Sequence, residues 1–547
     1  MGLDRRSMLR GVGAVMTMGS VPVLWDAAAF AQGETTVEVE HGSLKGRRAS
    51  GVIVFKGIPY GGSVTGNGRF LQAPPVSPWP GVRNALDYGP PCIQNNTDYS
   101  AWIDPKPGAE NCLVLNVWTP QITGKRPVMV WIHGGGYSSG SGGLPIYDGA
   151  ALARKGDVVV VTVNHRLNIF GYLHLAAFDQ RYASSGNAGQ LDLVQALQWV
   201  SKNIGAFGGD PGNVTIFGES GGGAKINALM AMPSAHGLFH KAVVESGSAL
   251  TVEEPESAER TGRAVLDALG LSTKEVSRLQ DVSAEKLLAT YVRVSGGGPS
   301  TEGAHHPFGP VVDGISIPAQ TWTPRAPEIS RVVALLVGTN HDETAAFIDK
   351  GMYDPPADDT ALRNRIKRAA VFSSPLSDDA VNSLISYYRK EMPSASRLDL
   401  LVRISTDVGM RRGAIEQAER QLALGAPVFM YEFDWRTPCF GGNWALHGIE
   451  IPFVFDNLDY GIAWDGHDTN AQRAAADPKG VRFRLADQTS GAWVAFACSG
   501  SPSHPGLPDW RPYTLAERKT MLLGGRCEVR SDPRRQDRLL IESVIRT

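Results

Sequence analysis

The sequence lacks the features that mark several common protein classes. It has 547 residues, only five of them cysteine, and a formal net charge of −2. Neither a Cys-x-x-Cys pair nor a His-Glu-x-x-His segment occurs, so we expect no metal site. A near-neutral charge without a basic stripe argues against nucleic acid as a partner. No Gly-Lys-Ser or Gly-Lys-Thr follows a glycine-rich loop, which excludes a phosphate-binding loop of that type.

The N-terminal segment has its features in the order of an export signal. The pair Arg5-Arg6 precedes a moderately apolar stretch from Gly11 to Leu24, and small residues follow it. This order predicts a twin-arginine signal over residues 1–31, with a periplasmic or secreted mature chain of residues 32–547. A retained helix is the alternative. A membrane anchor is disfavoured because polar residues, Gly and Pro interrupt a stretch that is barely long enough to span a bilayer.

The cysteines fit an oxidising compartment, in which disulfides persist. Cys92 and Cys112 are close in sequence and flank a polar, proline-containing loop, so we predict a disulfide between them. Cys439, Cys498 and Cys527 leave an odd number. A Cys498–Cys527 pair is one alternative, and spacing alone assigns none of the three.

Short apolar runs alternate with helical patterns along the chain. Alternating apolar and polar residues predict an antiparallel hairpin within residues 37–60. Strands buried on both faces, as in a parallel sheet, are predicted at residues 128–132, 158–163, 214–217, 332–337 and 428–433. Helices are predicted at residues 191–204 and 224–232, and helical insertions that cap the sheet within 251–300 and 355–425. The mature chain is therefore predicted to be a single α/β domain.

The segment Gly218-Glu219-Ser220-Gly221-Gly222 follows a predicted strand and precedes a predicted helix. A serine on such a sharp turn is exposed at the carboxyl end of the sheet, and the flanking glycines relieve the steric clash of the turn. The pattern predicts a nucleophile elbow with Ser220 as the nucleophile. A glycine-rich turn with an incidental serine is the alternative.

A second glycine run, His133-Gly134-Gly135-Gly136-Tyr137, follows the strand that ends at Ile132. The tetrahedral oxyanion of ester cleavage needs preorganised N–H donors, each contributing about 3–4 kcal/mol. A glycine run at this place supplies two donors, and the residue after the nucleophile supplies a third. We therefore predict an oxyanion hole formed by Gly135, Gly136 and Gly221.

A serine nucleophile needs a histidine base and an acid that orients the base. Among the 12 histidines, His447 is preferred because it lies in a loop after the strand that ends near Phe433. The acid is expected just past the strand at 332–337, where Asp342 and Glu343 are adjacent. Residue chemistry alone leaves both acids open.

These motifs carry a resemblance to a known family over nearly the whole mature chain. Its ordered segments include residues 55–60, 110–118, 133–137, 164–167, 207–211, 218–222, 308–314, 342–343, 447–452 and 510–513. The sequence resembles the type-B carboxylesterases, which include bacterial para-nitrobenzyl esterases, animal carboxylesterases and cholinesterases. The resemblance implies the α/β-hydrolase fold and hydrolysis of a small-molecule carboxylic ester through an acyl-enzyme on Ser220, without a cofactor.

The resemblance also implies roles for single residues. The family's aspartate–glutamate pair matches Asp342 and Glu343, and the glutamate is the triad member, which selects Glu343. Ser246 matches a serine that supports the triad from behind. The family also has a disulfide at the positions of Cys92 and Cys112.

Other activities use the same machinery. An enzyme of this fold that prefers amide, carbamate or lactone bonds, or that passes the acyl group to an alcohol, is the main alternative. A catalytically inactive adhesion protein is disfavoured by the intact Ser220, Glu343 and His447.

The candidate positions for an effect on substrate preference are Gly221, Tyr99, Trp102 and Phe308. Gly221 stands where the family usually has alanine, and we expect this to loosen the turn. Tyr99 and Trp102 either line the active-site gorge or pack their own loop. Phe308 is expected to pack in the core rather than to shape the acyl pocket.

Overall fold

The structure, a computed structural model, describes residues 33–95, 107–296, 307–350, 355–369, 376–436, 444–459 and 470–545. The chain divides into two units, Met1–Ala31 and Gln32–Thr547, and the described residues all belong to the second. The predicted export signal, together with Tyr99, Trp102 and Cys439, lies outside the described residues.

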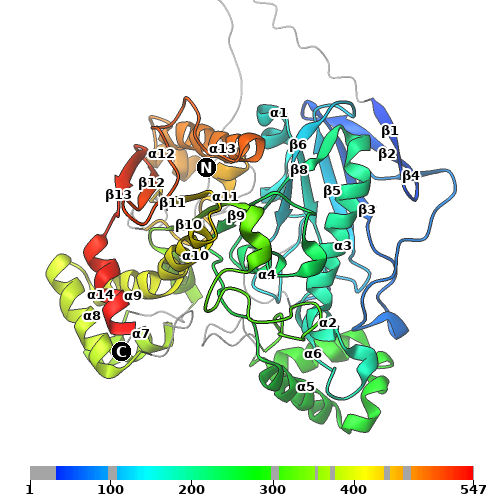
Figure 1. The fold of residues 1–547 in the computed structure, drawn as a ribbon, viewed down its shortest axis with the longest axis horizontal. Coiled ribbons are helices and arrows are strands. Elements are labelled where there is room, and N and C mark those ends of the chain that lie inside the picture. Colours follow the sequence, from blue (N-terminus) through cyan, green and yellow to red (C-terminus); the bar gives the residue numbers. More distant parts are fainter. Residues whose placement is uncertain are drawn as a thin grey trace, which may run out of the picture. The chain divides into compact units, whose positions relative to one another are not determined.

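One 13-stranded sheet runs through the described part of the second unit (Figure 1). Its order is β1-β2-β3-β5-β7-β6-β8-β9-β10-β11-β12-β13, and β4 pairs with β2. The strands are β1 Glu34–Val39, β2 Gly42–Ala49, β3 Val52–Pro59, β4 Val82–Asn84, β5 Val114–Thr119, β6 Arg126–Ile132, β7 Val159–Val163, β8 Gly209–Glu219, β9 Lys241–Glu245, β10 Ala334–Asn340, β11 Val428–Asp434, β12 Lys519–Gly524 and β13 Glu528–Ser531.

The central strands are parallel, as the apolar runs predict. Every neighbouring pair from β7 through β6 and β8 to β12 is parallel, whereas β1, β2, β3 and β5 at one edge and β13 at the other pair antiparallel. Because the carboxyl ends of parallel strands lie at one edge of a sheet, residues that follow β6, β8, β10 and β11 come together there.

Helices bury both faces of the central sheet (Figure 1). Along β6, Val130 packs in one apolar core, whereas Met129 and Trp131 pack in the core on the opposite face. The first core includes residues of α3 Ala188–Asn203, α4 Gly221–Leu229 and α10 Arg412–Ala423. The second includes residues of α1 Ala150–Gly156, α11 Ile451–Val454 and α13 Val481–Ser499. This two-sided burial is why the strands read as continuous apolar runs.

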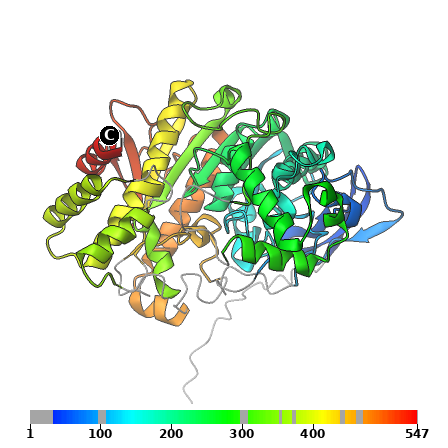
Figure 2. The same cartoon turned by 90° about the horizontal axis from the view of Figure 1, so that it is seen from below.

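The predicted helical insertions are present as two groups, seen from a second side in Figure 2. The first contains α5 Pro255–Leu269 and α6 Ala284–Val294, which contact each other. The second contains α7 Asp359–Ala369, α8 Asp378–Glu391 and α9 Arg397–Thr406, which share a third apolar core with α14 Arg535–Ile545. The short α2 Asn168–Tyr172 and α12 Asn470–Ala476 complete the α-helices of the described chain. None of the described helices is both long and apolar enough to cross a membrane.

The architecture confirms the predicted α/β-hydrolase fold, with some elements missing from the prediction. The hairpin expected within residues 37–60 is present as β1, β2 and β3. The strand β9 was not predicted, because Lys241 and Glu245 at its ends shorten its apolar run, although every residue in it is buried. Phe308 is buried and packs edge-on against Tyr291, as expected for a core residue.

Candidate active site

Ser220 lies on the sharp turn between β8 and α4, as the elbow motif predicts. Its φ of 55° and ψ of −122° place a non-glycine residue in a strained conformation. The Ser220 N–H donates to the Glu245 carbonyl at 2.8 Å, which ties the turn to the end of β9. Glycine is required beside it, because a Cβ on Gly222 would lie 2.0 Å from the carbonyl oxygen of Ile132.

His447 and Glu343 are in direct contact. The His447 Nδ1 lies 2.6 Å from Glu343 Oε2, and Glu343 is fully buried. The second carboxylate oxygen of Glu343 accepts a hydrogen bond from the Asn340 N–H at 2.8 Å. The imidazole contacts one carboxylate oxygen, and the backbone at the end of β10 contacts the other. These two contacts fix the orientation of the Glu343 carboxylate.

Asp342 points away from His447. Its Oδ2 lies 2.9 Å from His341 Nδ1 and accepts from the Ala445 N–H at 3.1 Å, and its Oδ1 accepts from Arg403 at 3.3 Å. The Asp342 N–H in turn donates to the Ala445 carbonyl at 2.9 Å. Adjacent acids thus have different tasks: Glu343 contacts the imidazole, and Asp342 holds the loop that carries it.

Asn340 stabilises the loop that carries His447. Its side-chain amide donates to the Leu446 carbonyl at 2.8 Å and to Glu450 Oε2 at 2.5 Å. The His447 N–H donates to the Glu343 carbonyl at 3.3 Å. The residues at the end of β10 and just after it therefore hold the His447 loop at several points.

A second acid lies next to the imidazole, and the sequence motifs did not predict it. Glu219 Oε1 lies 3.1 Å from His447 Nε2. In the described chain, no hydrogen bond joins Ser220 Oγ to His447. The signal that could have found Glu219 is its place in the elbow motif itself, directly before the nucleophile.

The carboxyls around the imidazole are buried and close enough to raise each other's pKa. Burial and, after it, the negative charge of Glu343 raise the pKa of Glu219 to about 7. His447 and Lys225 lower this pKa in turn. Burial and then Glu219 raise the pKa of Glu450 well above its usual range. Desolvation alone would lower the pKa of His447, but Glu219 and Glu343 raise it to about 10. These carboxylates therefore favour the imidazolium.

Glu245 extends this group at the end of β9. Burial first raises its pKa to about 8; the Trp493 hydrogen bond opposes the shift, and Glu219 adds to it. Its Oε1 accepts from the indole N–H of Trp493 at 2.9 Å. At neutral pH the proton on this buried carboxyl removes a charge that would otherwise be costly to bury.

The predicted oxyanion loop lies directly against the elbow. Gly135 and Gly136 have φ of 83° and 59°, which favours glycine. A Cβ on Gly221 would lie 2.3 Å from the Gly136 carbonyl oxygen and 2.5 Å from its nitrogen. Within the described residues, the backbone N–H groups of Gly135, Gly136 and Gly221 donate no hydrogen bond to the protein. Gly221 thus lets the loop approach more closely than the family's alanine would.

Ser246 lies behind the elbow, next to Glu245. It is 3% exposed, has a φ of 52°, and its N–H donates to the Gly338 carbonyl at 2.9 Å. Its hydroxyl has no hydrogen-bond partner among the described residues. A supporting role behind the triad, which the resemblance implies for Ser246, stays a prediction.

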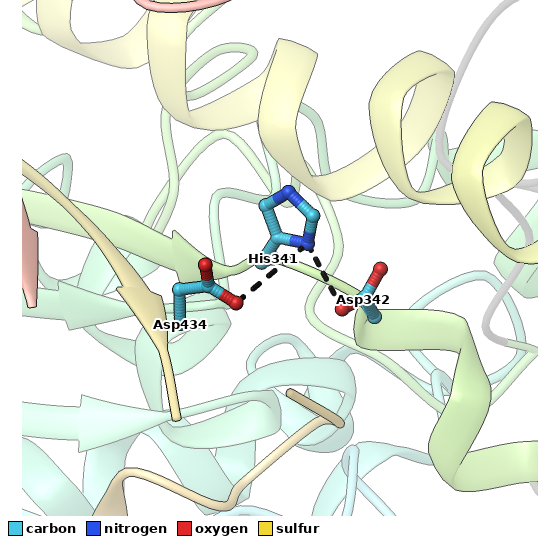
Figure 3. Close-up of side chains that lie close together, drawn as sticks. All are labelled: His341, Asp342 and Asp434. Carbon is cyan, nitrogen blue, oxygen red and sulfur yellow. Dashed lines mark hydrogen bonds and ion pairs between the residues drawn. The ribbon is translucent and has the colours of Figure 1, made fainter. Parts of the chain in front are cut away.

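Three potential metal ligands lie at the neighbouring ends of β10 and β11, as Figure 3 shows. One ligand atom each from His341, Asp342 and Asp434 lie within 4.8 Å of one another. Arg403 Nη2, however, lies 2.9 Å from His341 Nδ1 and 2.8 Å from its Nε2, and Arg436 Nε lies 3.1 Å from Asp434. Two guanidinium groups already balance the carboxylates, so we interpret the cluster as an ion network.

The predicted disulfide is not formed in the structure. Cys92 and Cys112 are buried free thiols, and Cys498 and Cys527 are free as well. Cys92, ahead of burial, raises the pKa of Cys112, which places the two thiols close together. The backbone therefore brings the predicted partners together without a bond between them.

Comparison with known proteins agrees with this geometry. Residues 33–538 match the Carboxylesterase family. The chain belongs to the carboxylesterase family. It is 37% identical to the para-nitrobenzyl esterase of Bacillus subtilis over 92% of this chain and 97% of that protein. It is 32% identical to the phenmedipham hydrolase of Pseudarthrobacter oxydans, over 92% and 98%.

Solved structures of carboxylesterases share the fold. A Geobacillus stearothermophilus carboxylesterase matches with a TM-score of 0.79 and 36% identity, covering 92% of this chain and 99% of that one. The protein is therefore a carboxylic ester hydrolase of the α/β-hydrolase fold, from a family that acts on small-molecule esters.

Proposed function

We propose that this carboxylesterase cleaves esters with Ser220 as nucleophile, His447 as base and Glu343 as the orienting acid. The observation that carries the proposal is the 2.6 Å contact between His447 Nδ1 and Glu343 Oε2 beside the strained Ser220 turn. A histidine whose Nδ1 is held by a buried carboxylate presents Nε2 for proton transfer.

The reaction proceeds in two acyl-transfer steps. His447 Nε2 takes the hydroxyl proton of Ser220, and the Ser220 oxygen attacks the ester carbonyl. The alcohol then leaves with that proton. Water then attacks the acyl-enzyme, gives its proton to His447, and releases the acid and free Ser220. In the structure Nε2 lies beside Glu219. The Ser220 contact forms when substrate binds, since hydrogen bonds in empty sites often tighten only then.

The negative oxygen of each tetrahedral intermediate binds to the N–H groups of Gly135, Gly136 and Gly221. Support comes from the free backbone donors and from the close approach of the loop to the elbow. Ser246 and the neighbouring carboxyl of Glu245 lie behind the triad and do not contact the ester.

Export across the cytoplasmic membrane completes the proposal. The Arg5-Arg6 signal over residues 1–31 directs the enzyme to the periplasm or the medium, and the neighbouring thiols of Cys92 and Cys112 oxidise there. Alkylation of the unfolded, unreduced exported protein should then leave Cys92 and Cys112 unlabelled. Labelling of both would contradict the disulfide.

The hydrolytic activity is tested with para-nitrophenyl esters from acetyl to long-chain and aromatic acyl groups. Wild type and Ser220→Ala are compared in parallel. We expect turnover in wild type and loss of at least about 10³-fold in the variant. Retention of most activity by Ser220→Ala would remove it as nucleophile.

A further inference from the structure

Lys225 is a buried lysine beneath the oxyanion loop. It lies on α4, just after the elbow, and is 0% exposed. Its Nζ donates a hydrogen bond to the His133 carbonyl oxygen at 3.0 Å and lies 5.8 Å from the centroid of the Tyr137 ring. Since these two residues bracket the three glycines, one ammonium group contacts both ends of the loop.

The surroundings make this ammonium costly to bury. Burial lowers the pKa of Lys225 to about 7, while the nearby Glu219 raises it. Two nearby histidines are neutral and carry none of the positive charge. Burial and then Lys225 lower the pKa of His133 to about 3 and the pKa of His165 well below its usual range. These rings stack with their centroids 4.7 Å apart. An apolar side chain of similar volume would avoid the desolvation cost, so packing alone does not account for Lys225.

We propose that Lys225 is a positioning residue for ester cleavage, which holds the loop from His133 to Tyr137 so that the Gly135 and Gly136 N–H groups face the reacting carbonyl. The inference rests on the proposed function, because it requires those groups to be the oxyanion donors. Gly135 and Gly136 both have positive φ angles and make the loop conformationally flexible. The hydrogen bond from Lys225 to the His133 carbonyl restricts this flexibility. Preorganised donors stabilise the oxyanion without reorganisation during the reaction, and the positive charge of protonated Lys225 behind them adds to the effect.

The test compares Lys225→Met with a matched control, Lys241→Met. Lys241 is 8% exposed and bonds to Asn213, at the start of β9 and away from the elbow, so its replacement also removes a mostly buried ammonium. Rates are measured with a para-nitrophenyl ester and divided by the active sites that a phosphonate ester titrates. We expect Lys225→Met to lower kcat by about 10- to 100-fold with little change in KM, and the control to change neither.

A trifluoromethyl ketone, which forms a tetrahedral adduct with an oxyanion, provides a second readout. Its affinity for Lys225→Met should fall by the same factor as kcat/KM, because the lost interaction is specific to the tetrahedral state. A purely structural lysine would lower the number of titrated sites without changing the rate per site.

Several results would overturn the inference. These are a kcat per site within about two-fold of wild type, an equal loss in Lys241→Met, or a loss expressed in KM alone. If Lys225→Met does not fold, Lys225→Gln carries the same comparison and expectation, because its shorter, neutral side chain removes the ammonium group that donates to His133. If wild type itself hydrolyses no activated ester, the proposed function fails and this inference with it. An active wild type with an unchanged rate per site in the Lys225 variant rejects only the role of Lys225.

Discussion

Glu219 Oε1 lies 3.1 Å from Nε2 of His447, the imidazole nitrogen opposite the one that Glu343 contacts. The imidazole is therefore placed between two carboxylates. Desolvation works against the imidazolium, yet Glu219 and Glu343 raise the pKa of His447. The proposed base must be neutral to accept the Ser220 proton, so we expect Glu219, together with Glu343, to shift the lower pH limit of activity upward.

Replacing Glu219 by glutamine should move the acidic limb of the kcat/KM–pH profile to lower pH. The pKa of His447 falls when a nearby negative charge is removed, and such a charge contributes about one to three units. The measurement is the pH profile of ester hydrolysis, with Glu391→Gln at the exposed end of α8 as the control. An unchanged acidic limb in Glu219→Gln would contradict this role.

Replacing each of the adjacent acids Glu343 and Asp342 by its amide should distinguish their roles in catalysis. Glu343→Gln removes the carboxylate that holds His447 Nδ1 and should lower kcat by about 10⁴-fold. Asp342→Asn perturbs only the bonds to Ala445, His341 and Arg403, so we expect a loss nearer 10- to 100-fold through displacement of the loop. Both rates are measured on one activated ester, and a greater loss at Asp342 would reverse the assignment.

An alanine at position 221 should damage this enzyme although it is usual in the family. Its Cβ would lie 2.3 Å from the Gly136 carbonyl oxygen, so the oxyanion loop must move. We expect Gly221→Ala to lower kcat by about 10²-fold per titrated site, comparable to losing one donor. Gly205→Ala, where an added Cβ meets nothing within 4 Å, is the control. Equal activity in the two variants would show that the loop adapts.

The buried carboxyl of Glu245 should make stability depend on pH. Burial first raises its folded-state pKa to about 8, so its contribution is complete below the unfolded-state pKa near 4.5 and is lost as the pH rises through about 8. Glu245→Gln keeps an acceptor for Trp493 and does not ionise. Its Tm relative to wild type should therefore increase from pH 5 to pH 8. A difference in Tm that is constant over this range would contradict the raised pKa.

The local motifs made much of the fold and site predictable. The apolar run at 128–132 and the glycines after it place β6 and its loop correctly, because sheet burial on both faces and positive φ angles each require particular residue types. The elbow is equally local: Ser220 lies where strand, turn and helix meet.

The charge network around His447 depended on contacts that no local pattern contains. Glu219 and Lys225 lie in and just after the elbow motif, whereas Glu450 lies far along the chain beside His447, and their burial follows from how β8, α4 and the His447 loop pack. The choice between Asp342 and Glu343 likewise needed the family resemblance, because the turn after β10 decides which carboxylate points at the imidazole. The Cys92–Cys112 disulfide remains a prediction, since the structure places the two thiols close together without a bond between them.

Covalent labelling with a para-nitrophenyl phosphonate tests the central claim most directly. The reagent phosphonylates an activated serine and releases para-nitrophenol, and peptide mapping by mass spectrometry locates the adduct. We predict stoichiometric release with the adduct on the peptide that contains Ser220, and neither in Ser220→Ala. An adduct on another residue, or undiminished labelling of Ser220→Ala, would contradict the account.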